Sequence, residues 1–121
     1  GYSMRINVDV NKIPYEFKLK CIDRIFILNF KHFISDNSIY IDLIDEDGDY
    51  QLENEKLIFG RAIGFYIQKD DQNNINPYMQ QAYIIPLNEH NNPCRITLET
   101  LGKSVFLEYF EINQNGEFIN E

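Results

Sequence analysis

Apolar and polar positions alternate along several short stretches of the chain. Over residues 15–22 the sequence YEFKLKCI places Tyr15, Phe17, Leu19 and Cys21 at every second position, with Glu or Lys between them. A period of two is typical of a strand with one face in a core and the other in water. The same reasoning predicts strands within residues 25–33, 39–44, 50–53, 56–68, 80–87 and 103–112. Because strands recur every eight to twelve residues without a long helix, we expect a mainly antiparallel β-barrel or β-sandwich.

Turn signals separate these strands. Asp47-Gly48 lies between residues 39–44 and 50–53, and this dipeptide favours a type I′ hairpin turn. A short helical turn is predicted over residues 97–101, capped by Thr97 and ended by Gly102.

Glycine and proline also interrupt two of the predicted strands. Gly60 and Gly64 fall inside the apolar segment 56–68, where they indicate a bulge, a bend or a close approach of another chain segment. Pro86 cannot donate a backbone hydrogen bond, so we expect it at a sheet edge or a strand end.

The pattern fits one domain. Residues 4–112 are predicted to form a single β domain, which includes a polar, Asn-rich loop at 69–79. The first three residues, which precede Met4, are interpreted as an addition to the natural chain. Residues 113–121 are predicted to be a polar arm or tail.

Charge narrows the classes of partner. The net charge of −8 is unevenly distributed: residues 1–34 carry six basic and three acidic residues, and residues 35–121 carry five basic and sixteen acidic ones. Such an acidic balance opposes binding to nucleic acid or to anionic membranes. There is no apolar run of the length that spans a bilayer and no signal-peptide pattern at the N-terminus, so we expect neither a membrane span nor export by a cleaved signal.

The two cysteines do not indicate a metal site. Cys21 and Cys94 are far apart in sequence and lack the spacing of zinc or redox motifs. Two free thiols in a reducing compartment are expected.

The acidic stretch LIDEDGDYQLENE, residues 43–55, is the main candidate for a site. If Gly48 were the sixth residue of a calcium EF loop, Leu43 and Asn54 would occupy the first and twelfth positions, where neither supplies the required carboxylate. A looser calcium site formed by Asp45, Asp47 and Asp49 stays open. The alternative is a solvated hairpin tip, which could also dock a basic partner.

Two other activities find little support in the sequence. Eight Tyr and nine Phe could stack on sugars, but most occupy core positions of the predicted strands and there is no Trp. His32 and His90 are the only histidines, and no nucleophile–base motif or phosphate-binding loop accompanies them. We therefore expect a protein that is not an enzyme and has no cofactor.

Several segments, taken in order, resemble the small baseplate plug proteins of contractile-tailed phages and related phage-tail-like particles. The resemblance covers about residues 13–110, nearly the whole domain. Its parts are an Ile-Pro strand, a Tyr/Asp-Leu strand before an Asp-Gly turn, and a closing Leu-Gly-x-x-Val-x-Leu-x-Tyr strand. They correspond to IPYEFKL (13–19), RIFILNFKHF (24–33), IYIDLIDEDGDY (39–50), KLIFGRAI (56–63) and TLETLGKSVFLEYFE (97–111). The longer, Asn-rich loop at 69–79 departs from the compact Pro-Gly turn of the family.

The resemblance implies a structural component of a virion tail or baseplate, made in the host cytoplasm and packed against hub and tube proteins. Docking is then expected through exposed strand edges, aromatic patches or the acidic residues Asp45, Glu46, Asp47 and Asp49. Self-association into a homo-oligomer stays open. The alternative function is a free-standing ligand-binding β-module for calcium or carbohydrate.

Overall fold

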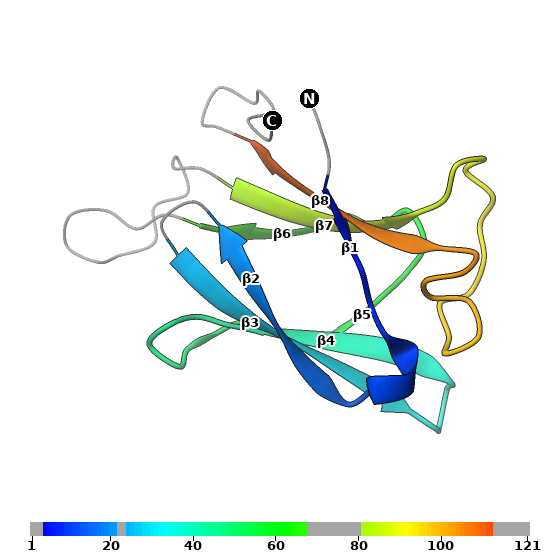
Figure 1. Ribbon diagram of the computed structural model, residues 1–121, viewed down its shortest axis with the longest axis horizontal. Coiled ribbons are helices and arrows are strands. Elements are labelled where there is room, and N and C mark those ends of the chain that lie inside the picture. The colour runs from blue at the N-terminus through cyan, green and yellow to red at the C-terminus, as the bar shows by residue number, and fades with distance from the viewer. Residues whose placement is uncertain (1–3, 22–23, 68–80, 113–121) are drawn as a thin grey trace.

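Two four-stranded antiparallel sheets make up the protein, as a computed structural model describes it for residues 4–21, 24–67 and 81–112. Figure 1 shows the sheets as two facing layers. The mainly β prediction is confirmed, and the sheets form a sandwich that is not closed into a barrel. One sheet has the order β1 (Met4–Ile6), β8 (Phe106–Ile112), β7 (Gln81–Leu87), β6 (Ile63–Tyr66), and the other β2 (Tyr15–Cys21), β3 (Arg24–Phe33), β4 (Ser38–Ile44), β5 (Tyr50–Lys56).

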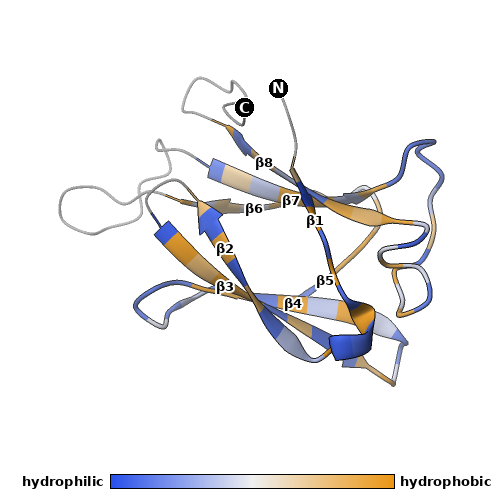
Figure 2. Cartoon of the chain, in the orientation of Figure 1, coloured by the Kyte–Doolittle hydropathy of each residue, from blue (hydrophilic) through white to orange (hydrophobic). Residues whose placement is uncertain are grey.

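The core lies between the sheets and is built by the alternation read from the sequence. In β3 the inward side chains Phe26, Leu28 and Phe30 are fully buried. Phe26 meets Phe65 of β6 edge to face, with ring centroids 5.4 Å apart, so the two layers interlock. Figure 2 shows apolar positions recurring along the strands, whereas the β4–β5 loop is mostly hydrophilic. Each such side chain contributes about 1.5–3 kcal/mol when fully buried.

The segment predicted as one strand over 56–68 divides into three parts. Lys56 ends β5, residues 57–62 cross from one sheet to the other, and only Ile63–Tyr66 form β6. Gly60 lies in the crossing with φ +76°, a conformation that side chains disfavour. Gly64 permits a close approach, because a Cβ there would lie 2.7 Å from Cε1 of Tyr83.

Pro86 lies near the end of β7, which is an interior strand of its sheet and not an edge. However, β6 pairs with β7 only as far as Ile84, so Pro86 lies beyond that pairing. A proline is tolerated there because no ladder hydrogen bond from its nitrogen is needed on that side.

The single turn predicted over residues 97–101 is present as one hydrogen-bonded turn that is not continued into a helix. The amide of Leu101 donates to the carbonyl of Thr97 at 3.0 Å, and Thr97 Oγ1 accepts from the amide of Glu99 at 3.2 Å. Gly102 follows with φ +84°. One turn is too short to nucleate a helix by itself. Within the described ranges the single helix is a 3₁₀ turn, η1 (Val10–Lys12), capped by Asp9, which the sequence pattern did not predict.

Three predictions fall on residues outside the described ranges: the addition at 1–3, the loop at 69–79 and the arm at 113–121. Among the described residues, no helix has the length and apolar character needed to cross a membrane.

Candidate functional site

The acidic loop, defined here as Asp45–Asp49, connects β4 to β5. The amide of Gly48 donates to the carbonyl of Asp45 at 3.0 Å, and the amide of Asp45 donates to the carbonyl of Asp49 at 2.9 Å. Gly48 has φ +85°, but Asp47 does not have the positive φ that a type I′ turn requires. The predicted type I′ turn is therefore wrong. The loop instead has three residues between its closing pair, with glycine in the left-handed position, a common alternative hairpin geometry.

The side chain of Asp45 holds this loop together from inside. It is only 4% exposed, and its Oδ1 accepts hydrogen bonds from the amides of Asp47 at 2.9 Å and Asp49 at 3.0 Å. Its Oδ2 accepts from Nε2 of Gln51 at 2.8 Å. Of the four predicted docking residues, Glu46, Asp47 and Asp49 are exposed, whereas Asp45 is buried.

Arg24 connects the acidic loop to the neighbouring strand. The strand predicted over residues 25–33 begins one residue earlier in the structure, since Arg24 pairs with Cys21 as the first residue of β3. Its Nη2 lies 3.3 Å from Oδ2 of Asp45, and its Nε lies 3.5 Å from Oε1 of Glu46. The guanidinium also lies over the ring of Phe26 at 4.8 Å. Its buried Nη1 has no hydrogen-bond partner among the residues that the structure describes, so the pairing with the loop does not satisfy every donor.

The predicted calcium ligands do come together. Carboxylate oxygens of Asp45, Asp47 and Asp49 lie within 4.8 Å of one another, a spacing that could hold a cation. Calcium requires six to eight oxygen ligands, and both oxygens of Asp45 already accept hydrogen bonds within the protein. A cation at this position would also compete with the guanidinium of Arg24 for Oδ2.

A second polar network lies on the outward face of the same sheet, and the sequence analysis did not identify it. Asp42 is 3% exposed; its Oδ1 accepts from the amide of Asn54 at 2.8 Å, and Nζ of Lys31 lies 2.9 Å from its Oδ2. Burial alone would raise the pKa of Asp42, but these two contacts outweigh it and hold the pKa below its usual range. Asn54 has φ +53° where the β4–β5 register shifts, so its left-handed backbone delivers the amide to Asp42.

A hollow with two cationic groups, Lys56 and Arg95, lies at the other end of β4. This cationic groove has a volume of about 530 Å³ and is lined by Ser38, residues 56–59 and residues 93–96. Nη2 of Arg95 donates to the carbonyl of Asp36 and to Oγ of Ser38, and Lys56 Nζ lies 3.5 Å from the Asp36 carboxylate. None of the described residues that line it is acidic. Sequence reasoning missed the groove because three separate segments build it.

The two histidines lie on different elements. His32 is in β3, with Nε2 2.8 Å from Oδ1 of Asn37. His90 lines a separate hollow of about 510 Å³ together with Glu89, Cys94 and Lys103. This hollow adjoins the cationic groove, since Pro93 and Cys94 line both.

Cys21 and Cys94 are free thiols, and their surroundings differ. Burial raises the pKa of Cys21 to about 12, only partly offset by a hydrogen bond with Tyr109. Burial, together with the hydrogen bonds to Cys21 and Glu111, also raises the pKa of Tyr109. Cys21 is therefore a protonated core thiol at neutral pH and not a nucleophile.

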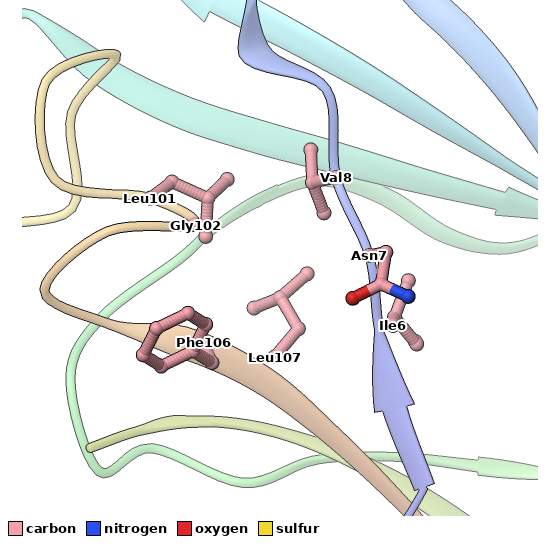
Figure 3. A pocket seen from close by; sticks show the side chains of 7 residues that line it. All are labelled: Ile6, Asn7, Val8, Leu101, Gly102, Phe106 and Leu107. Carbon is pink, nitrogen blue, oxygen red and sulfur yellow. The ribbon is translucent and has the colours of Figure 1, made fainter.

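A smaller pocket of about 90 Å³ lies beside the end of β1, as Figure 3 shows. It is formed by Ile6, Asn7 and Val8 on one side and by Leu101, Gly102 and residues 106–107 on the other. No lining residue is titratable, so the pocket offers space but no chemistry.

The chain matches no protein-family model, and a comparison with curated protein sequences finds no match. Function must therefore be argued from the residues themselves.

Proposed function

We propose that this chain is a structural, non-enzymatic component of the baseplate of a contractile phage tail or a phage-tail-like particle, where it packs as a plug-like protein against hub and tube proteins. The observation that carries the proposal is the ordered resemblance of five segments between residues 13 and 111 to the baseplate plug family.

The positions of these segments support it. Residues 24–33 coincide with β3, residues 39–50 contain the acidic loop and all of β4 except Ser38, and residues 97–111 contain most of β8. These three strands are interior strands of the two sheets. The residues that carry the resemblance are therefore those that define the sandwich, as expected of residues that mark a fold.

The exposed acidic loop supports a docking role. Glu46, Asp47 and Asp49 project from a loop whose backbone is held by Asp45, so their positions are largely set before a partner arrives. A preorganised charged surface loses little conformational entropy on binding and favours partners of opposite charge.

The test is to isolate tails or tail-like particles from the strain that encodes the chain and to quantify their proteins by mass spectrometry. We expect the chain at a fixed ratio to the tube and hub proteins through density-gradient purification. Deletion of its gene should yield tails with incomplete baseplates in electron micrographs, restored by the wild-type chain. Intact, infective or lytic particles that lack the chain would refute the proposal.

The second candidate is a ligand-binding β-module, favoured by the convergence of Asp45, Asp47 and Asp49 within 4.8 Å. A ligand that binds only the folded state raises its stability by about 2.7 kcal/mol at a concentration one hundred times Kd. Thermal unfolding with calcium and with EDTA tests whether the loop is a calcium site or a docking surface without bound calcium. A calcium-dependent rise in Tm that Asp47→Asn/Asp49→Asn abolishes would favour the module, and an unchanged Tm at millimolar calcium would exclude a functional calcium site.

A further inference from the structure

The acidic loop and the cationic groove lie at opposite ends of β4. Ser38, the first residue of β4, lines the groove, whereas Ile44, the last, precedes the loop. Figure 1 shows the β4–β5 loop on the left and the β3–β4 turn on the right. A strand of seven residues spans about 20 Å at ~3.3 Å per residue, so the loop cannot reach the groove of its own chain.

The groove combines positive charge with apolar surface. Asp36 partly neutralises Lys56, but no described carboxylate lies within salt-bridge distance of Arg95. Beside these cations the groove presents Ile58, which is 42% exposed, and the ring of Phe59. In a chain of net charge −8, a hollow lined by two cations and no acid fits an acidic segment that also carries an apolar or aromatic side chain.

The acidic loop has this composition. Glu46, Asp47 and Asp49 are exposed, and Tyr50 directly after them is 54% exposed. Tyrosine is among the residues that most often anchor protein interfaces, since its ring covers apolar surface and its hydroxyl stays hydrogen bonded.

We propose that the acidic loop of one copy docks in the cationic groove of a second copy, with Asp47 and Asp49 facing Arg95 and Lys56, and with Tyr50 against Ile58 and Phe59. The contact is head to tail, because it joins two different surfaces. Each added copy leaves one loop and one groove open, so the contact generates a closed ring or an open filament. The inference does not rest on the baseplate proposal, since self-association and presence in particles are measured separately.

The first measurement is sedimentation velocity of the purified chain from about 10 µM to 1 mM, a range that detects weak contacts. We expect the weight-average mass to rise with concentration and to fall as salt rises from about 50 to 500 mM, because exposed charge pairs are screened. A mass that stays that of the monomer throughout, or that is unaffected by salt, would overturn the proposal.

Two neutralising variants then test which surfaces meet. Arg95→Gln removes one of the two positive charges of the groove, and Asp47→Asn/Asp49→Asn removes two negative charges of the loop. Given about 0.2–1 kcal/mol for each exposed charge pair, Arg95→Gln should weaken association by up to about fivefold, and the loop variant, which loses two pairs, by roughly two- to thirtyfold. Matched controls are Lys12→Gln for the groove and Glu16→Gln/Glu53→Gln for the loop, which change the same charge at exposed positions elsewhere. The control variants should associate like the wild type. If they weaken association as much as the test variants do, the effect comes from net charge alone and the proposed contact is refuted.

A mixture of the two variants decides the geometry. The Arg95→Gln chain retains its loop, and the Asp47→Asn/Asp49→Asn chain retains its groove, so a mixture contains one intact contact. We expect dimers of one chain of each kind, with no larger species, under conditions where each variant alone is monomeric. If the mixture stays monomeric while the wild type associates, the contact joins like surfaces and the head-to-tail assignment is wrong. Circular dichroism of each variant confirms folding before the comparison is made.

Discussion

Replacing Asp45 by alanine should destabilise the protein more than any other change in the acidic loop. The carboxylate is 4% exposed and accepts three hydrogen bonds from the loop and Gln51, at 2.8–3.0 Å. It is also the nearest counter-charge to Arg24, whose side chain is 9% exposed. Alanine would leave two loop amides without their side-chain acceptor, and Glu46 would be the one described carboxylate still paired with the largely buried guanidinium.

The magnitude follows from these contacts. Breaking a buried ion pair by removing one partner costs about 3–5 kcal/mol, because the remaining charge stays buried. The Arg24–Asp45 pair is longer than an ideal one at 3.3 Å, and Glu46 gives partial compensation, so we expect the lower end, about 3 kcal/mol. Asp45→Asn keeps an acceptor for the two amides but leaves the same buried guanidinium without this counter-charge, so it should cost about 2 kcal/mol, less than alanine. Against a total stability of about 5–15 kcal/mol, either change is measurable.

Urea unfolding followed by circular dichroism gives the free energy of unfolding for each variant. Asp49→Ala is the matched control, since it removes the same charge from the same loop at an exposed position and should change stability by about 0.5 kcal/mol or less. Arg24→Met in the Asp45→Ala background should recover part of the loss, because it removes the stranded charge. A loss below about 1 kcal/mol for Asp45→Ala, or no recovery in the double variant, would refute the role given to this pair.

Three further predictions concern other parts of the sandwich. Gly64→Ala should lower the free energy of unfolding in urea by about 1–3 kcal/mol, since the new Cβ would lie 2.7 Å from Tyr83. The cost should be smaller in a Tyr83→Ala background, and an equal cost there would contradict the steric explanation. Because the pKa of Asp42 is held below its usual range, its carboxylate stabilises the folded state fully above about pH 4, and this stabilisation is lost as pH falls through the lowered pKa. Asp42→Asn should therefore flatten the acid side of the curve of unfolding free energy against pH. Parallel curves for the variant and the wild type would exclude this role. A thiol reagent should label Cys94 in the native protein but Cys21 only in urea, since Cys21 is fully buried with a pKa of about 12. In a Cys94→Ser variant Cys21 is the remaining thiol, so labelling of that variant without urea would show that the core opens.

The sequence predicted those parts of the fold that depend on local alternation. The strands predicted at 15–22, 25–33 and 39–44 each have one continuous apolar face, and β2, β3 and β4 match them within a residue. Where a strand is short or its pattern mixed, the prediction was less accurate. β1 has three residues and is defined only by its pairing with β8, a partner about one hundred positions away. The segment 57–62 is as apolar as a strand, but it crosses between the sheets.

The candidate site was predicted only in part, for a similar reason. The acidic residues of the loop are adjacent in sequence, so their proximity needed no knowledge of the fold. The burial of Asp45 depends on Arg24, which comes from another strand, and the pairing of Asp42 with Lys31 depends on the β3–β4 register. The cationic groove needs Lys56 and Arg95 side by side, and no local pattern indicates that. Charge counts along the sequence also could not show that the two features lie at opposite ends of β4.

Because the buried carboxylate of Asp45 fixes the loop, stability and docking are assigned to different acids of one short segment. Asp45 accepts the internal hydrogen bonds, and the exposed carboxylates of Asp47 and Asp49 are displayed on the backbone that it holds. This division makes the two roles separable by mutation. Asp47→Asn/Asp49→Asn should alter binding without lowering stability, whereas Asp45→Asn should lower stability first. If the loop served only as a solvated turn, Asp45→Asn would still lower stability, but Asp47→Asn/Asp49→Asn would leave binding unchanged. The two measurements therefore distinguish a docking surface from a connection between two strands.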